Sequence, residues 1–233
     1  AASDVYKRQK IRNFNLNWEI RDLMASRLVL ALDETDPARA LEVAKEVSPF
    51  VSKIKINYPL VLSAGLEIVT EISKFSKVIC DFKVADIPNT NRLITEAVFS
   101  AGATGIIAHA FPGPESLRAI REVDPSKEMY VVITMSHPKG GDHFKIEEFC
   151  SLALEVGATG VVAPATRPED VARVKSLIGD LEIISPGVGA QGGDSKETIM
   201  AGADFIIVGR GIYQADNPAS AAEKYMSEMD IND

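Results

Sequence analysis

A chain of 233 residues with 46% hydrophobic and 25% charged residues has the composition of an ordinary globular protein with enough apolar material for a large core, which excludes intrinsic disorder. The formal net charge of −8 excludes the basic excess that drives nonspecific nucleic-acid binding, so a small anionic ligand needs a local positive pocket. No apolar run approaches the roughly 18 residues of a membrane helix, and two cysteines, Cys80 and Cys150, are too few for a disulfide framework, which favours reduced thiols and a cytoplasmic location.

The first stretch of the chain, residues 1–26, is polar and mixed in charge. We interpret it as an N-terminal extension, either helical or partly non-native, and leave it out of the fold argument. The catalytic domain is expected at 27–233. No linker or low-complexity tract divides that part of the chain, so one domain is predicted.

From residue 27 onward, short β-branched runs alternate with amphipathic segments. Eight runs are candidate strands: Leu28–Leu32, Val51–Ile56, Val78–Phe82, Gly105–His109, Met129–Thr134, Gly160–Ala163, Glu182–Ser185 and Asp204–Val208. Strands that are apolar on both faces and alternate with helices indicate a parallel sheet covered by helices. Eight such units in about 200 residues predict an α/β protein with a closed (β/α)8 TIM barrel rather than an open doubly wound sheet.

Local signals for helix ends support this reading. Asp36-Pro37 and Asn217-Pro218 each place a capping side chain before a proline at the first helical position. Three similar phrases, Ser100-Ala-Gly-Ala-Thr-Gly, Val156-Gly-Ala-Thr-Gly and Met200-Ala-Gly-Ala-Asp, precede strands. In each of them a glycine is expected to take the left-handed position that ends a helix.

Charged residues cluster where the first three strands end. The third strand runs into Asp81-Phe-Lys-Val-Ala-Asp86, and side-chain alternation places Asp81 and Lys83 on one face. Lys55 near the end of the second strand and Asp33 after the first approach the same end of the barrel. A salt-bridge network that only plugs the barrel would explain any single residue, but five charges at one end favour a functional site.

Glycine-rich loops follow the seventh and eighth strands. The first reads Gly187-Val-Gly-Ala-Gln-Gly-Gly-Asp194, and the second Val208-Gly-Arg-Gly-Ile-Tyr213. These loops of a TIM barrel commonly bind phosphate through backbone N–H groups and a helix N-terminus, and Gln191 and Arg210 add donors. The first loop also matches G-x-G-x-x-G, but too little chain follows it for a dinucleotide-binding domain, so phosphate is favoured over NAD.

The fifth strand ends in Thr134-Met-Ser136-His-Pro, followed by Lys139-Gly-Gly-Asp-His143, which suits a movable loop over a site. Ser136 is expected to bind a ligand or to cap the loop. It lacks a G-x-S-x-G elbow and a visible triad, so nucleophilic serine chemistry is not expected. The three histidines, His109, His137 and His143, do not have the spacing of zinc ligands.

Taken together, these phrases resemble the orotidine 5′-phosphate decarboxylase family in its compact archaeal-type form. The resemblance covers roughly Arg27 to Ala222. Its most specific phrases are Asp81-Phe-Lys-Val-Ala-Asp-Ile-Pro, Met135-Ser-His-Pro, Ser185-Pro-Gly-Val-Gly-Ala-Gln-Gly-Gly-Asp and Val208-Gly-Arg. One position departs from the family pattern: Asn57 stands where glycine often follows the strand-two lysine. Asn57 can either touch ligand or only shape the loop.

The resemblance implies decarboxylation of orotidine 5′-phosphate to uridine 5′-phosphate, the last step of de novo UMP synthesis, with no metal or organic cofactor. It implies a catalytic tetrad, a substrate-binding set, and a homodimer in which three residues reach the neighbouring site. The tetrad is Lys55, Asp81, Lys83 and Asp86; the ribose contacts are Asp33 and Lys55, the pyrimidine contacts Ser136 and the Val188 backbone, the phosphate contacts Gln191 and Arg210, further substrate contacts Pro186 and Gly209, and the dimer contacts Asp86, Ile87 and Thr90. Lys83 would stabilise and protonate a carbanion at C6.

Two rival functions stay open. The nearest is a related barrel enzyme, 3-keto-L-gulonate 6-phosphate decarboxylase or hexulose-phosphate synthase, which shares the Asp-x-Lys-x-x-Asp phrase, uses Mg²⁺ and carries a glutamate on strand two. This chain has Lys55 there, and a lysine repels a metal cation. The second is a noncatalytic barrel that binds phosphoribosyl ligands, against which the intact tetrad argues.

Overall fold

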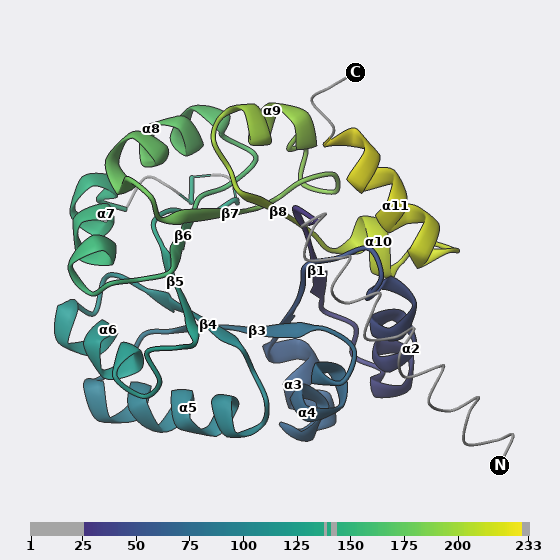
Figure 1. Ribbon diagram of the computed structural model, residues 1–233, viewed down its shortest axis with the longest axis horizontal. Helices are drawn as coiled ribbons and strands as arrows, with labels where there is room; N and C mark the ends of the chain where they lie inside the picture. Colours follow the sequence, from purple (N-terminus) through teal and green to yellow (C-terminus); the bar gives the residue numbers. More distant parts are fainter. Residues whose placement is uncertain (1–25, 138, 141–143, 230–233) are drawn as a thin grey trace, which may run out of the picture.

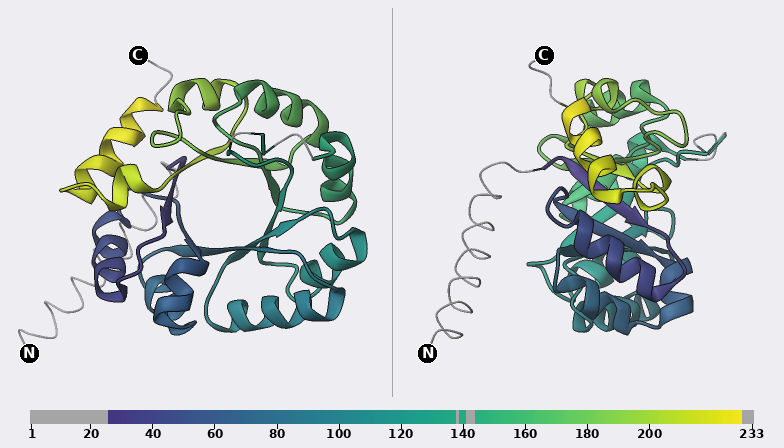
Figure 2. Two further views of the ribbon diagram at one scale, coloured as in Figure 1. Left: turned by 180° about the vertical axis from the view of Figure 1, so that it is seen from behind. Right: turned by 90° about the vertical axis from the view of Figure 1, so that its right-hand side faces the viewer.

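A computed structural model describes residues 26–137, 139–140 and 144–229. Eight parallel strands close into a barrel in the order β1 to β8, and helices surround it (Figure 1). Figure 2 shows the same ring of helices from behind and from the side. The predicted TIM barrel is therefore confirmed. Residues 1–25 of the expected N-terminal extension lie outside the described residues.

The strands are β1 (Leu28–Leu32), β2 (Lys53–Asn57), β3 (Lys77–Val84), β4 (Gly105–His109), β5 (Glu128–Val132), β6 (Gly160–Val162), β7 (Glu182–Pro186) and β8 (Phe205–Val208). The described helices are α2 (Pro37–Val47), α3 (Tyr58–Ala64), α4 (Glu67–Ser73), α5 (Pro88–Ser100), α6 (Pro114–Arg121), α7 (Ile146–Glu155), α8 (Pro168–Ile178), α9 (Ser195–Met200), α10 (Arg210–Tyr213) and α11 (Pro218–Glu228).

All eight predicted strands are present, with shifted ends in six of them. The fifth strand was expected to run to Thr134 but ends at Val132. The backbone N–H groups of Ile133 and Thr134 both donate to the carbonyl oxygen of Val162, so regular pairing with β6 stops there. This early end frees the segment after β5 to turn across the barrel mouth.

Helix ends follow the predicted chemistry. The Asp36 side chain accepts a hydrogen bond from Ala38 N at 2.9 Å, and the Asn217 side chain accepts one from Ser220 N at 2.9 Å. The three turn glycines have positive φ angles, 103° at Gly102, 66° at Gly157 and 109° at Gly202. Only glycine adopts this region without strain, which explains why the same turn recurs before three strands.

Apolar side chains fill two separate spaces. The larger core lies between the barrel and the helices and includes Cys80 and Phe82, which point away from the barrel interior as alternation predicts. Both cysteines are buried and unpaired. A second cluster fills the barrel itself: Val29, Ala31, Ile79, Ile107, Tyr130, Val132, Val162, Ile184 and Ile207. Within the described chain no helix is long and apolar enough to cross a membrane.

A polar network closes the amino-terminal end of the barrel. Lys53, only 5% exposed, places its Nζ 2.7 Å from Tyr130 Oη and 2.8 Å from Glu128 Oε1. The Tyr130 hydroxyl donates to Glu182 Oε2 at 2.7 Å. The β2 strand therefore sends two lysines into the barrel, Lys53 at this end and Lys55 at the opposite one.

Candidate active site

One pocket opens at the carboxyl ends of the strands, where a TIM barrel carries its function. Each of the eight strands contributes to its lining, either directly or through the loop that follows it. β4 contributes only the strand residue Ile107. The lining residues are Ala31, Asp33, Lys55, Asn57, Asp81, Lys83, Ile107, Val132, Thr134, Met135, Ser136, Val162, Pro186, Gly187, Val188, Ala190, Gln191, Ile207, Gly209, Arg210 and Tyr213. The two groups of residues predicted from the strand ends and from the glycine-rich loops therefore meet in one cavity.

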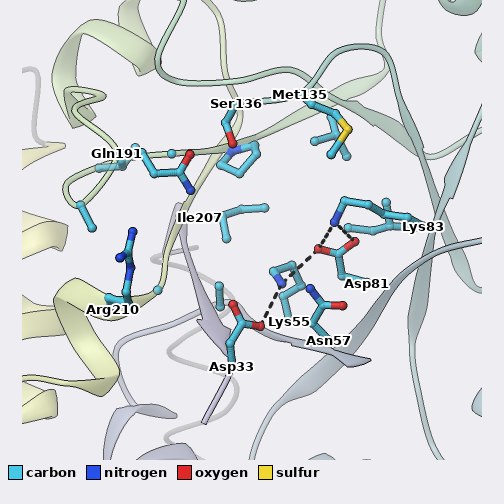
Figure 3. Close-up of a pocket in the computed structure, with 18 of the residues that line it drawn as sticks. Asp33, Lys55, Asn57, Asp81, Lys83, Met135, Ser136, Gln191, Ile207 and Arg210 are labelled. Atoms are coloured by element: carbon cyan, nitrogen blue, oxygen red, sulfur yellow. Dashed lines mark hydrogen bonds and ion pairs between the residues drawn. The ribbon is translucent and has the colours of Figure 1, made fainter. Parts of the chain in front are cut away.

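A chain of alternating charges occupies one side of the pocket (Figure 3). Lys55 Nζ lies 3.1 Å from Asp81 Oδ2 and 3.8 Å from Asp33 Oδ1. Lys83 Nζ lies 2.8 Å from Asp81 Oδ1. Asp81 thus sits between two ammonium groups, and a negative carboxylate that faces two cations is held in place at each oxygen.

Burial and pairing act in opposite directions on these groups. Burial by itself lowers the pKa of Lys55, but the charges of Asp81 and Asp33 outweigh it, and the Lys55 pKa ends above its usual value. Burial likewise raises the pKa of Asp81, but Lys55 and Lys83 outweigh it, and the Asp81 pKa ends below its usual value. The pair is therefore ionised over the whole neutral range.

The Lys83 backbone departs from a regular strand. Its φ is 44°, in the left-handed region that a lysine rarely adopts, and the pairing of β3 with β4 shifts register between Cys80 and Val84. A bulge of this kind re-aims a side chain. Sequence alternation predicted that Asp81 and Lys83 would share a face, and they do, but the local strain that aims Lys83 at the carboxylate was not predicted.

The two side chains that were predicted to bind phosphate lie on the opposite side of the pocket. Gln191 belongs to the loop after β7, and Arg210 begins α10 after β8. Figure 3 shows both side chains facing the cavity across from Lys83. A bridge from Val188 to Gly193 shapes the loop that carries Gln191, and Val188 and Gly209 also line the cavity.

Ser136 and Met135 lie between the two ends of the pocket (Figure 3), and Pro186 also lines it. Arg167 fixes the segment that carries the first two, because its Nη2 donates to the Met135 carbonyl oxygen at 2.7 Å and to Thr134 Oγ1 at 3.0 Å. This contact was not predicted, since it joins segments 32 residues apart. The following segment contains Pro138 and 141–143, including His143, which lie outside the described residues, so the movable loop stays a prediction.

Asn57 shapes its loop, and its contact with a ligand stays a prediction. It lines the pocket, and its Oδ1 accepts a hydrogen bond from Tyr58 N at 2.7 Å, which caps α3. Tyr213, which was not predicted as a site residue, also lines the pocket from α10. Burial, and then the charge of Asp33, raise the pKa of the Tyr213 phenol.

The expected fifth charge, Asp86, does not line this pocket among the described residues of one chain, and neither do Ile87 and Thr90. Asp86 lies just beyond β3, where Asn91 Oδ1 accepts its N–H at 2.9 Å and Ser116 Oγ donates to its carbonyl oxygen at 2.8 Å. The single-chain pocket thus holds four of the five predicted charges. Ile87 beside it is 65% exposed.

No histidine lines the pocket among the described residues. His109, at the end of β4, packs against Phe111 and Phe144 with tilted rings, whose centroids lie 5.0 and 6.0 Å away. Burial, and then the charge of Lys83, lower its pKa. Within the described ranges no three His, Cys, Asp or Glu side chains are grouped so that they could hold a metal ion.

Comparisons with known proteins agree with this architecture. Residues 26–225 match the model of the "Orotidine 5'-phosphate decarboxylase / HUMPS family". The chain is 56% identical over 209 residues to the orotidine 5′-phosphate decarboxylase of Methanococcoides burtonii, covering 88% of this chain and 97% of that protein. It is 52% identical to that of Methanosarcina acetivorans, covering 87% and 94%.

A solved structure is similar over the same range. The orotidine 5′-monophosphate decarboxylase of Methanocaldococcus jannaschii, complexed with the inhibitor BMP, superposes with a TM-score of 0.83 at 40% identity, covering 87% of this chain and 98% of that one. The match to the family model spans most of the chain and all eight strands. The chain therefore belongs to the orotidine 5′-phosphate decarboxylase / HUMPS family.

Proposed function

We propose that this chain decarboxylates orotidine 5′-phosphate to uridine 5′-phosphate and CO₂ without a metal or an organic cofactor. The observation that carries the proposal is the Asp33, Lys55, Asp81 and Lys83 array, which faces Gln191 and Arg210 across one pocket. Family membership and the names of the relatives support it.

The two ends of the pocket suggest how the substrate lies. Arg210 and Gln191 are the donors suited to a phosphate, and backbone N–H groups of the glycine-rich loop add to them. Asp33 and Lys55 would contact the ribose, while Ser136, Pro186 and the Val188 backbone would contact the pyrimidine. This orientation brings C6 of the pyrimidine to Lys83. Remote phosphate binding can then contribute to orientation at the reacting carbon.

The proposed reaction breaks the bond between C6 and the carboxylate carbon. The electron pair stays on C6 as CO₂ leaves, and no adjacent group can delocalise it. The Lys83 ammonium stabilises this carbanion and then donates a proton to C6, after which water reprotonates the amine. Lys83 is suited to this because Asp81 already holds its Nζ at 2.8 Å. A preorganised cation costs no reorganisation at the moment when the charge develops.

We further propose a homodimer in which Asp86, Ile87 and Thr90 complete the pocket of the neighbouring chain. These residues lie in the turn after β3 and in the first turn of α5, yet they do not line their own pocket among the described residues. Apolar side chains in segments that follow β2 and β4 are exposed, such as Leu62 (81% exposed) and Phe111 (61% exposed). A second copy of the chain could bury them. A cytoplasmic location fits two buried, unpaired cysteines.

A metal-dependent reaction of the same family finds less support in the site. Lys55 Nζ lies 3.1 Å from Asp81, where a cation such as Mg²⁺ would need free carboxylate oxygens. The proposal is tested by mixing purified protein with orotidine 5′-phosphate in EDTA and following the loss of orotate absorbance. Full activity in EDTA is expected. Activity that disappears with the chelator and returns with Mg²⁺ would sink the assignment.

A further inference from the structure

Tyr225, on α11, contacts both of the segments that carry the proposed phosphate donors. A Cβ atom built on Gly189 would lie 2.5 Å from Tyr225 Oη, and one built on Gly211 would clash with the same oxygen. Gly189 stands two residues before Gln191, and Gly211 directly follows Arg210. One hydroxyl oxygen therefore occupies the space that side chains at both positions would need.

The two glycines differ in why they must be glycine. Gly189 has a φ of 72°, so an alanine there is strained whatever space surrounds it. Gly211 lies within α10 and has no positive φ. Glycine inside a helix is disfavoured relative to alanine, so the reason for a glycine at 211 is the room that Tyr225 requires.

The surroundings place Tyr225 between the two segments. Figure 1 shows α11 beside α10, and α11 also contacts α9, which follows the glycine-rich loop. A cavity behind the loop is lined by Gly189, Gly211, Ser195 and Tyr225 among others, and Ser195 Oγ is buried there without a hydrogen-bond partner among the described residues. Within this lining, the Tyr225 hydroxyl oxygen is the atom that lies closest to the Cβ positions of both glycines.

We propose that Tyr225 is a positioning residue for phosphate: its hydroxyl sets the separation of the Gln191 loop and the start of α10, so that Gln191 and Arg210 can reach one phosphate group together. Tyr225 does not itself line the substrate pocket. The inference rests on the phosphate role proposed above for Gln191 and Arg210. It extends that role to a residue on a different helix, behind the loops.

The test is a double-mutant cycle between Gly211 and Tyr225. The measured quantity is kcat/KM for orotidine 5′-phosphate divided by kcat/KM for orotidine, which lacks the phosphate. Gly211→Ala should lower this ratio by about 10- to 100-fold, because a misplacement of about 1 Å can cost on the order of 100-fold. Tyr225→Phe removes only the oxygen and should lower it by less than about tenfold. With the oxygen gone, the nearest ring carbons lie 3.2 Å from the added Cβ, so the double variant should return to within about threefold of Tyr225→Phe.

Two control variants separate the contact from backbone strain. Gly189→Ala meets the same oxygen but has a positive φ, so Tyr225→Phe should rescue it only in part. Gly157→Ala, whose added Cβ meets nothing within 4 Å, should not be rescued at all. The Tm of every variant is also measured. If Tyr225→Phe restores the Tm that Gly211→Ala lowers, the steric contact is demonstrated without any measurement of activity.

A double variant as poor as Gly211→Ala in both Tm and the kinetic ratio would overturn the inference. Rescue of Tm without rescue of the ratio would also overturn it, because Tyr225 would then be a packing residue only. If wild-type protein does not turn over orotidine 5′-phosphate, the proposed function fails. The cycle is then read from the Kd of uridine 5′-phosphate relative to uridine, and an unchanged Kd ratio in Gly211→Ala would contradict the positioning role.

Discussion

Lys83 Nζ donates to both carboxylate oxygens of Asp81, at 2.8 Å to Oδ1 and 2.9 Å to Oδ2. The two residues are only two positions apart in β3, and a regular strand would project them in parallel rather than toward each other. The left-handed backbone of Lys83 makes the contact possible. The ammonium group is therefore aimed before any substrate arrives.

The first prediction concerns proton delivery. Lys83→Ala should leave the fold intact, because the Lys83 side chain is one-third exposed, at 33%. Turnover of orotidine 5′-phosphate should fall by more than about 10³-fold, since positioned general acids alone contribute roughly 10²- to 10⁴-fold. Binding of uridine 5′-phosphate should survive, because it depends on the phosphate loops.

Hydrogen exchange run in the reverse direction tests the same residue directly. Wild-type protein in D₂O should slowly replace the C6 hydrogen of uridine 5′-phosphate with deuterium, followed by proton NMR, and Lys83→Ala should not. Lys55→Ala should retain some exchange because the donor remains. The surface variant Lys74→Ala should behave as wild type. Comparable exchange in wild type and Lys83→Ala would mean that water or another group carries the proton.

A second prediction concerns the buried ion pairs. Asp81→Asn leaves Lys55, which is 5% exposed, without its nearer counter-charge. Removing one partner of a buried pair costs about 3–5 kcal/mol, so the free energy of unfolding at pH 7 should fall by that amount. Asp33→Asn should cost less, since its oxygen is 3.8 Å from the ammonium and its side chain is 36% exposed.

The pH dependence of that deficit follows from the directions of the pKa shifts. The Asp81 pKa is lowered and the Lys55 pKa is raised. The pair therefore stabilises the fold between the ordinary values of 3.8 and 10.5, and the contribution is lost as pH falls through the lowered Asp81 pKa or rises through the raised Lys55 pKa. Urea unfolding from pH 7 to 11 should show the Asp81→Asn deficit shrinking at the alkaline end. A deficit that does not change with pH would assign the cost to packing instead.

The third prediction concerns phosphate recognition. Arg210→Ala should lower kcat/KM for orotidine 5′-phosphate by about 10- to 100-fold, as expected for a charge-assisted hydrogen bond of about 1.5–3 kcal/mol. The phosphate-free nucleoside should be affected far less. Arg173→Ala, which removes an exposed arginine paired with Glu147, is the matched control. Equal losses on both substrates would remove Arg210 from the phosphate site.

The fourth prediction tests the shared site of the proposed dimer. Lys83→Ala and Asp86→Asn should each be inactive alone. After mixing and subunit exchange, activity should recover to about one quarter of wild type, since half of randomly paired dimers then carry one intact site. A mixture of Lys83→Ala with Lys55→Ala should not recover, because both lysines belong to the same pocket. Failure of the first mixture to recover, with exchange verified, would place Asp86 in its own chain's site.

Much of the fold could be predicted because its signals are local. The strand runs, the caps at Asp36 and Asn217, and the turn glycines at 102, 157 and 202 each depend on a few neighbouring residues. The meeting of Asp81, Lys83 and Arg210 in one pocket could be predicted as well, since a closed parallel barrel gathers the strand ends at one mouth.

The contacts that escaped prediction are those that no local pattern encodes. Arg167 reaches Met135 across 32 residues, and Tyr225 approaches two glycines from a different helix. Tyr213 lines the pocket because α10 starts directly at Arg210. The strain at Lys83 arises from a register shift between two strands, which depends on their pairing and not on the composition of either.

The two inward lysines of β2, Lys53 and Lys55, lie toward opposite ends of the barrel. Lys53 is tied into the closed amino-terminal end, and the apolar cluster that includes Ile79, Ile107 and Ile184 lies inside the barrel. Such a layer offers no hydrogen-bonded relay for a proton. In the proposed mechanism the Lys83 ammonium is therefore restored by solvent that enters at the mouth where substrate binds. Substrate, product and the proton that Lys83 gives up in that mechanism would then all pass through one opening.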